Sequence, residues 1–150
     1  MHTERLAKLR NRIEKEGIDA LFLSNPVNVH YIAGMGEDSY LLVSADKAIF
    51  LTDSRYTEAA ENSVKVAEVR MWKDDLYAHV AEHAAKMGAK SIGFEQSHIT
   101  VAQHKKLQKQ FEGANLVATD GFVEDLRIIK DENEVALVRA AAEIANKALT

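Results

Sequence analysis

A short apolar run that ends at a proline-containing turn constrains this chain more than any other feature. Ala20 to Leu23 form a run of the length expected for a buried strand. The run ends at Ser24-Asn25-Pro26, which contains the only proline of the 150 residues, and Asn-Pro favours a turn. A buried strand that delivers a polar loop at its carboxyl end is the usual way in which an α/β sheet presents a site. The sequence therefore places a candidate site directly after this strand.

Asn28, Tyr31 and Gly34 follow the turn at intervals of three residues. On one helical turn or in a tight coil, this spacing brings all three to the same side. One interpretation is a polar group that contacts a ligand. The other is a capped turn in which Tyr31 only packs, since loops carry function only in some cases. The pattern by itself leaves both open.

Helix and strand patterns alternate along the rest of the chain. Two apolar stretches, 40–43 and 48–52, flank a short polar turn and predict an antiparallel hairpin. Further strands are expected at 64–71, 91–94 and 116–118, and helices at 3–16, 54–62, 75–87, 100–111, 120–126 and from 131 onward. Strands that alternate with helices after a hairpin predict an α/β fold with a mixed β-sheet and helices packed on it.

Polar residues at the helix starts predict the caps. Thr3 and Asp53 are expected N-caps, and Asp131 with Glu134 has the spacing of a capping box. The segment after Asp53 has a second interpretation, because Arg55 offers a fork of donors to a carboxylate on a substrate or on a neighbouring subunit. Capping is the commoner use of an aspartate at such a position.

Composition excludes several classes of protein. The length suits one domain, and 47% apolar with 28% charged residues is ordinary for a globular protein. A net charge of −4 argues against nucleic-acid binding, and the lack of cysteine excludes disulfides and thiolate metal sites. No apolar run approaches the ~20 residues of a membrane span, and the charged amino terminus lacks the apolar core of a signal peptide. We expect a cytoplasmic protein without a membrane partner.

A short motif, His79-Val-Ala-Glu-His83, matches the H-x-x-E-H pattern of one class of zinc peptidases. On a helix the two histidines are one turn apart and can share a metal ion. However, they fall on the polar border of the apolar stripe of this helix, and no distant glutamate completes a site. The sequence therefore favours two solvated histidines and no metal ligand.

Three stretches together resemble the amino-terminal domain of the creatinase / Xaa-Pro peptidase family, which includes prolidase and aminopeptidase P. They are Asp19 to Gly34, Thr52-Asp-Ser-Arg-Tyr56, and Glu124-Asp-Leu-Arg-Ile-Ile-Lys130 with the helix after it. The departures are mild: Ala33, Met35 and Asp131-Glu-Asn stand where the family usually has other residues. The resemblance implies a three-layer unit, a mixed β-sheet with helices on both faces, ribonuclease H-like in outline.

The resemblance also implies a division of the chain. Residues 1–130 correspond to the creatinase/prolidase N-terminal domain, and residues 131–150 to a linker helix that leads to a catalytic "pita-bread" domain absent from this chain. The pattern of the helix agrees with this, because two apolar stripes require two packing surfaces. They comprise Val135, Val138, Ala142, Ala145 and Leu149 on one side and Leu137, Ala141, Ile144 and Ala148 on the other.

By resemblance, the chain is the non-catalytic part of an Xaa-Pro dipeptidase or aminopeptidase. It is expected to pack on its own catalytic domain, to aid homodimer formation, and to restrict the active site to short proline-containing peptides. Two divalent metal ions (manganese, cobalt or zinc) are expected in the catalytic domain, held by two Asp, one His and two Glu. None of these ligands can be assigned here, so the fragment should be inactive.

Four residues are expected to face the neighbouring subunit's active site by their position in the resemblance: Asn28, His30, Tyr31 and Arg55. No catalytic residue is expected within the chain. Two alternatives share the architecture. One is the N-terminal domain of a creatinase-like amidinohydrolase, which does not use the metals, and the other is a non-enzymatic peptide- or histone-binding module.

Overall fold

The computed structural model describes all residues from Met1 to Thr150 and contains one six-stranded sheet. In the order β4-β3-β2-β1-β5-β6, only β2 runs antiparallel to its neighbours. The carboxyl ends of the other five strands therefore lie at one edge of the sheet, together with the start of β2. We call this the carboxyl edge. The strands are β1 (Ala20–Leu23), β2 (Ser39–Ser44), β3 (Ala48–Thr52), β4 (Glu68–Met71), β5 (Ser91–Glu95) and β6 (Asn115–Thr119).

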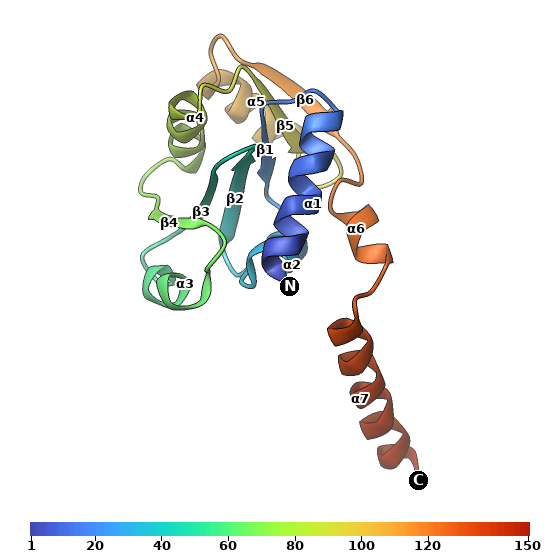
Figure 1. Cartoon of the computed structure of the whole chain (residues 1–150). Coiled ribbons are helices and arrows are strands. Elements are labelled where there is room, and N and C mark those ends of the chain that lie inside the picture. The colour runs from blue at the N-terminus through green and yellow to red at the C-terminus, as the bar shows by residue number, and fades with distance from the viewer.

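Helices cover both faces of the sheet, which confirms the predicted three-layer α/β fold (Figure 1). The helices are α1 (His2–Lys15), α2 (Pro26–Ala33), α3 (Thr57–Ser63), α4 (Leu76–Lys86), α5 (Val101–Gln110), α6 (Glu124–Ile128) and α7 (Glu132–Leu149). On one face α1 and α2 pack on the sheet, and on the other face α4 and α5 do so. Since α2 directly follows β1, it lies at the carboxyl edge.

The central strand β1 is buried on both faces, as its apolar run predicted. Leu21 and Leu23 point into the core beneath α1 and α2, whereas Ala20 and Phe22 point into the core beneath α4 and α5. This division follows from the two-residue period of a strand. Burial of each large apolar side chain stabilises the fold by about 1.5–3 kcal/mol, so the two cores together fix the position of β1.

Two predicted caps are wrong. Thr3 lies inside α1, because the carbonyl of Met1 already accepts from the amide of Arg5 at 3.2 Å and the helix starts earlier. Asp53 precedes α3 by a full turn, because its carboxylate accepts from Arg55 rather than from the first helical amides. The capping box of Asp131 with Glu134 is present as predicted.

Two predicted elements are shorter or shifted. The strand expected at 64–71 begins at Glu68, because Val64 ends α3 and is buried in the core. The helix expected at 120–126 begins at Glu124, because Gly121 has a positive φ of 68° and interrupts the helical path.

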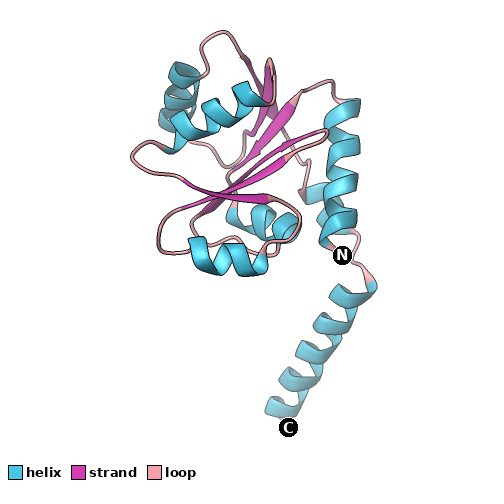
Figure 2. Cartoon of the chain, turned by 60° about the vertical axis from the view of Figure 1, so that its left-hand side comes forward, coloured by secondary structure: helices cyan, strands magenta, loops and turns pink.

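The last helix, α7, extends away from the sheet and buries none of its residues (Figures 1 and 2). Large apolar side chains of α6, of α7 and of the segment between them are exposed: Ile128, Ile129, Val135, Leu137, Val138, Ile144 and Leu149. None of the helices is both long and apolar enough to cross a membrane.

Candidate functional site

The polar residues predicted after β1 lie on α2, at the carboxyl edge. Asn25 caps this helix by accepting from the amide of Val27 at 3.0 Å, and Pro26 occupies its first turn. Gly34 ends it with a left-handed φ of 88°. The predicted turn of helix is therefore present, and Asn28 and Tyr31 each make a contact with α6.

Asn28 is fully buried and makes three side-chain hydrogen bonds. Its Nδ2 donates to Oε1 of Glu95 at 2.6 Å and to Oε1 of Glu124 at 2.7 Å. Its Oδ1 accepts from Nη1 of Arg127 at 3.0 Å. Both amide protons and the carbonyl oxygen are thus satisfied within the chain. Asn28 connects α2 with the end of β5 and with α6.

Glu95 is the buried carboxylate on which this arrangement depends. Its second oxygen, Oε2, accepts from the backbone amides of Ser24 and Asn25, each at 2.7 Å. These backbone donors satisfy the hydrogen-bonding capacity of the buried carboxyl group. The sequence reasoning missed Glu95, although a charged residue at the end of the apolar strand 91–95 was a signal for it. It also missed the partners Glu124 and Arg127.

Tyr31 lies between α6 and α1. Its hydroxyl donates to the carbonyl of Leu126 at 3.1 Å, and the guanidinium carbon of Arg5 lies 3.9 Å from the centre of its ring. Burial raises the pKa of the Tyr31 hydroxyl above its ordinary value, so the group is a neutral donor at physiological pH. Arg5 was also missed, because nothing in the helical pattern distinguishes it from a surface arginine.

His30 points to solvent from the same helix. It borders a cavity of about 290 Å³ that is also lined by Pro26, Val27, Gly36 and Glu37. Backbone segments approach each other closely here, since a Cβ atom on Gly36 would lie 2.2 Å from the carbonyl oxygen of Pro26. Of the three α2 residues predicted to face a site, His30 is the one whose side chain is freely accessible.

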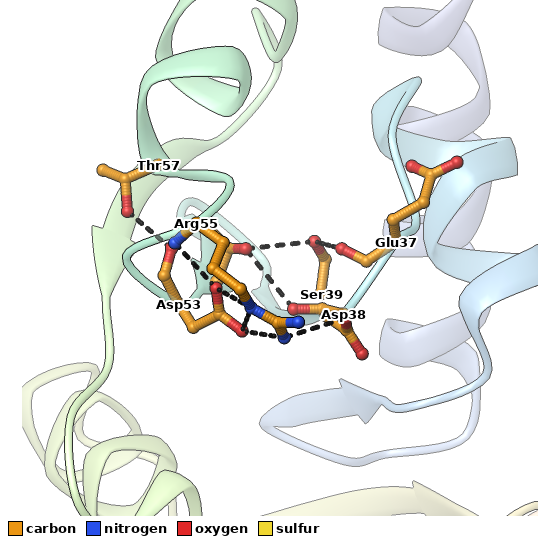
Figure 3. A network of polar contacts seen from close by, with 7 residues as sticks. Glu37, Asp38, Ser39, Asp53, Arg55 and Thr57 are labelled. Carbon is orange, nitrogen blue, oxygen red and sulfur yellow. Dashed lines mark hydrogen bonds and ion pairs between the residues drawn. The ribbon is translucent and has the colours of Figure 1, made fainter.

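Arg55 lies in the turn that follows β3 and joins two loops of the carboxyl edge (Figure 3). Its Nη2 donates to Oδ2 of Asp53 at 2.6 Å and to Oδ2 of Asp38 at 3.0 Å. The hydrogen bonds from Arg55 lower the pKa of Asp53 below its ordinary value. The side chains of Arg55 and Asp38 are 65% and 57% exposed, so both charged groups are accessible from solvent.

The four predicted site residues therefore fall into two groups. His30 and Arg55 are exposed, whereas Asn28 and Tyr31 hold α6 against the domain. All four lie on or beside the carboxyl edge. The accessible imidazole and guanidinium groups are suited to hydrogen bonding with an external molecule.

No group of three or more His, Asp and Glu side chains is placed to hold a metal ion. The two histidines of the H-x-x-E-H motif differ in their contacts. Nε2 of His79 lies 3.1 Å from the carbonyl oxygen of Lys73. His83 is partly buried, and burial lowers its pKa below the ordinary value.

Comparison with known proteins covers almost the whole chain. The sequence profile of the Creatinase/Prolidase N-terminal domain matches residues 5–129. An uncharacterized peptidase of Bacillus subtilis, YqhT, is 36% identical over 145 residues, which are 96% of this chain and 41% of the relative. The Xaa-Pro dipeptidase of Pyrococcus furiosus is 29% identical over 148 residues, which are 97% of this chain and 41% of the relative. The chain thus spans about two fifths of the length of these curated relatives.

Solved structures agree with the sequence comparison. An Xaa-Pro dipeptidase from Bacillus anthracis superposes with a TM-score of 0.94 at 30% identity, over 99% of this chain and 42% of that one. The N-terminal domain of the cytoplasmic peptidase PepQ from Mycobacterium tuberculosis gives a TM-score of 0.77 at 32% identity, over 83% of this chain and 98% of that one. The chain therefore belongs to the creatinase/prolidase N-terminal domain family.

Proposed function

We propose that this chain is the non-catalytic amino-terminal domain of an Xaa-Pro dipeptidase or aminopeptidase. The observation that carries the proposal is the superposition of 99% of the chain on an Xaa-Pro dipeptidase of which it covers only 42%. The chemistry of the parent protein would then reside in the remaining part.

The proposed partner of the domain is its own catalytic domain, reached through α7. The apolar side chains of α6 and α7 support this, because exposed apolar surface of this extent marks an interaction site. The two divalent metal ions, manganese, cobalt or zinc, would belong to that catalytic domain. A cytoplasmic location is proposed by analogy with PepQ.

The proposed role of the carboxyl edge is to limit access to the active site of a neighbouring subunit in a homodimer. His30 and Arg55 are the accessible groups that would meet a peptide or the neighbouring subunit. Asn28 and Tyr31 would act indirectly, by holding α2 and α6 in position. Such an edge would admit short proline-containing peptides and exclude longer chains.

Activity measurements on two proteins test the proposal. The full-length parent should hydrolyse Xaa-Pro dipeptides or short peptides when supplied with manganese, cobalt or zinc. The 150-residue chain should hydrolyse none of them under the same conditions. Turnover by the purified chain that a chelator abolishes would contradict the non-catalytic assignment. Metal-independent turnover of creatine by the parent would instead support the amidinohydrolase alternative.

A further inference from the structure

One buried guanidinium holds the start of α7 against the domain. The side chain of Arg5, on α1, is only 9% exposed. Its Nη2 donates to Oδ2 of Asp131 at 2.8 Å and lies 3.2 Å from Oε1 of Glu134. Its Nη1 donates to the carbonyl of Tyr31 at 3.0 Å. A single side chain thus connects α1, α2 and the first turn of α7.

The two carboxylates that Arg5 contacts also form the cap of α7. Oδ1 of Asp131 accepts from the amide of Glu134, and Oε2 of Glu134 accepts from the amide of Asp131, both at 2.9 Å. Each carboxylate therefore uses one oxygen for the capping box and the other for Arg5. The groups that start the helix are the same groups that tie it to the domain, so its first turn cannot rotate freely without breaking a charge-assisted hydrogen bond.

The contacts before α7 strengthen this arrangement. The Tyr31 hydroxyl holds the carbonyl of Leu126 in α6, and the Tyr31 ring lies against the Arg5 guanidinium. The short connection between α6 and α7 is thus held at both ends by the Arg5–Tyr31 pair. Beyond its first turn α7 has no buried residue that could set its direction.

We propose that Arg5 is a positioning residue that fixes the angle at which α7 leaves the domain. It thereby determines the direction in which the exposed apolar stripes of α7 are presented to a binding partner. An arginine suits this role because its planar fork contacts two carboxylates and a carbonyl at once, which a lysine ammonium cannot do in the same geometry. The inference concerns this chain alone and holds whether or not the parent protein is a peptidase.

Distance measurements between two spin labels test the inference directly. The chain has no cysteine, so Gln108→Cys on α5 and Asn146→Cys on α7, both at exposed positions, give two unique labelling sites. Double electron–electron resonance should show a narrow distance distribution for the otherwise unchanged chain. Arg5→Met should broaden it about twofold, because a segment held by few contacts opens at low free energy. Arg5→Lys should have an intermediate effect.

A matched control and a second variant make the result decisive. Arg10, also on α1, donates to the carbonyl of Ser44 in β2 and does not contact α7, so Arg10→Met should leave the distribution narrow. Asp131→Ser keeps a residue that can cap α7 but removes the closer of the two carboxylate contacts with Arg5. It should therefore broaden the distribution, though less than Arg5→Met does, while carbon chemical shifts still report a helix. This variant also serves if Arg5→Met fails to fold. An unchanged distribution in Asp131→Ser, or in a folded Arg5→Met chain, would overturn the proposal.

Discussion

The side-chain amide of Asn28 lies 2.6 Å from Oε1 of Glu95, although 67 residues separate the two in the sequence. The contact joins the helix after β1 to the end of β5, and Glu124 extends it to α6. Asn28 therefore acts as a buried connection within the domain. Among the predicted site residues of α2, this leaves the exposed His30 for direct contact with other molecules.

Replacement of Asn28 should destabilise the domain. In Asn28→Ala the buried Glu95 carboxylate loses one donor and Arg127 loses its acceptor, so we expect a loss of about 2–4 kcal/mol. Urea unfolding followed by circular dichroism measures it. As a control, Asn115→Ala removes an exposed asparagine at the start of β6 and should change stability by less than about 0.5 kcal/mol. Equal urea midpoints for the two variants would mean that the hydrogen bonds of Asn28 contribute nothing to the free energy of unfolding.

Gly36 should not accept a side chain. A Cβ atom at this position would lie 2.2 Å from the carbonyl oxygen of Pro26 and 2.9 Å from Cβ of His30, so backbone has to move in Gly36→Ala. We expect a loss of about 3 kcal/mol in thermal or urea unfolding. At Gly88 the surroundings are open and only the positive φ of 70° opposes alanine, so Gly88→Ala should cost about 1 kcal/mol. A larger loss of stability in Gly88→Ala than in Gly36→Ala would refute the close backbone approach at Gly36.

The pairing of Arg55 with Asp53 predicts a pH dependence. The hydrogen bonds from Arg55 hold the pKa of Asp53 below 3.8 in the folded chain. A carboxyl group whose pKa is lower in the folded than in the unfolded chain stabilises the fold at any pH above its unfolded pKa. This stabilisation is lost as the pH falls through the folded pKa. In Arg55→Gln, the pKa of Asp53 measured by NMR titration should therefore rise toward 3.8.

The unfolding midpoints should show the same dependence. The difference between the Arg55→Gln variant and the unchanged chain should be present at about pH 6 and should shrink as the pH falls through the lowered pKa of Asp53 in the folded chain. A difference that stays constant over this range would show that Arg55 stabilises the fold through other contacts.

In the full-length parent, the residues of the carboxyl edge should affect peptide hydrolysis. We expect His30→Ala and Arg55→Ala to lower kcat/KM by about tenfold to a hundredfold, mostly through KM, because groups that only orient a substrate contribute to binding. Asn28→Ala and Tyr31→Phe should lower kcat/KM by a similar factor through displacement of α2 and α6. A loss as large as that of a metal-ligand variant would contradict an orienting role. An equal effect in a forced monomer would rule out action on the neighbouring subunit.

The two histidines of α4 should be dispensable for metal content. His79→Ala with His83→Ala should leave the metal content of the purified chain unchanged and shift stability by at most about 0.5–1 kcal/mol, since no three side chains here are placed to hold a metal ion together. Atomic absorption and thermal unfolding check both points. One zinc ion per chain in the unchanged protein, lost in the double variant, would refute this.

The elements that the sequence predicted well are those set by local chemistry. The apolar run Ala20–Leu23 and the stripe formed by Leu6, Leu9 and Ile13 each match one period of one regular structure, and all of these residues are buried. The capping box of α7 depends on residues three positions apart, so it is visible in the sequence. A hydrophobic period and a capping box can both be recognised in the sequence without knowledge of the rest of the fold.

The candidate site could be predicted only in part, because its partners are distant in the sequence. The spacing of Asn28 and Tyr31 shows that they share a helix face but not which element covers that face. Glu95, Arg127 and Arg5 reach this face from three other elements, and only the topology of the sheet brings them there. Asp53 was misjudged for the same reason, since the guanidinium of Arg55 competes with the helix amides for its carboxylate.

The reversed direction of β2 has a consequence for how the chain folds. β1, β2 and β3 pair in sequence order through nearby residues, so this meander can form early and at a small cost in loop-closure entropy. The parallel pairing of β1 with β5 has to wait for a chain segment about seventy residues away, as between Ala20 and Ile92. Non-local parallel pairing of this kind slows folding. We expect amide protection, followed by pulsed hydrogen exchange, to develop in β1, β2 and β3 before it appears in β5 and β6.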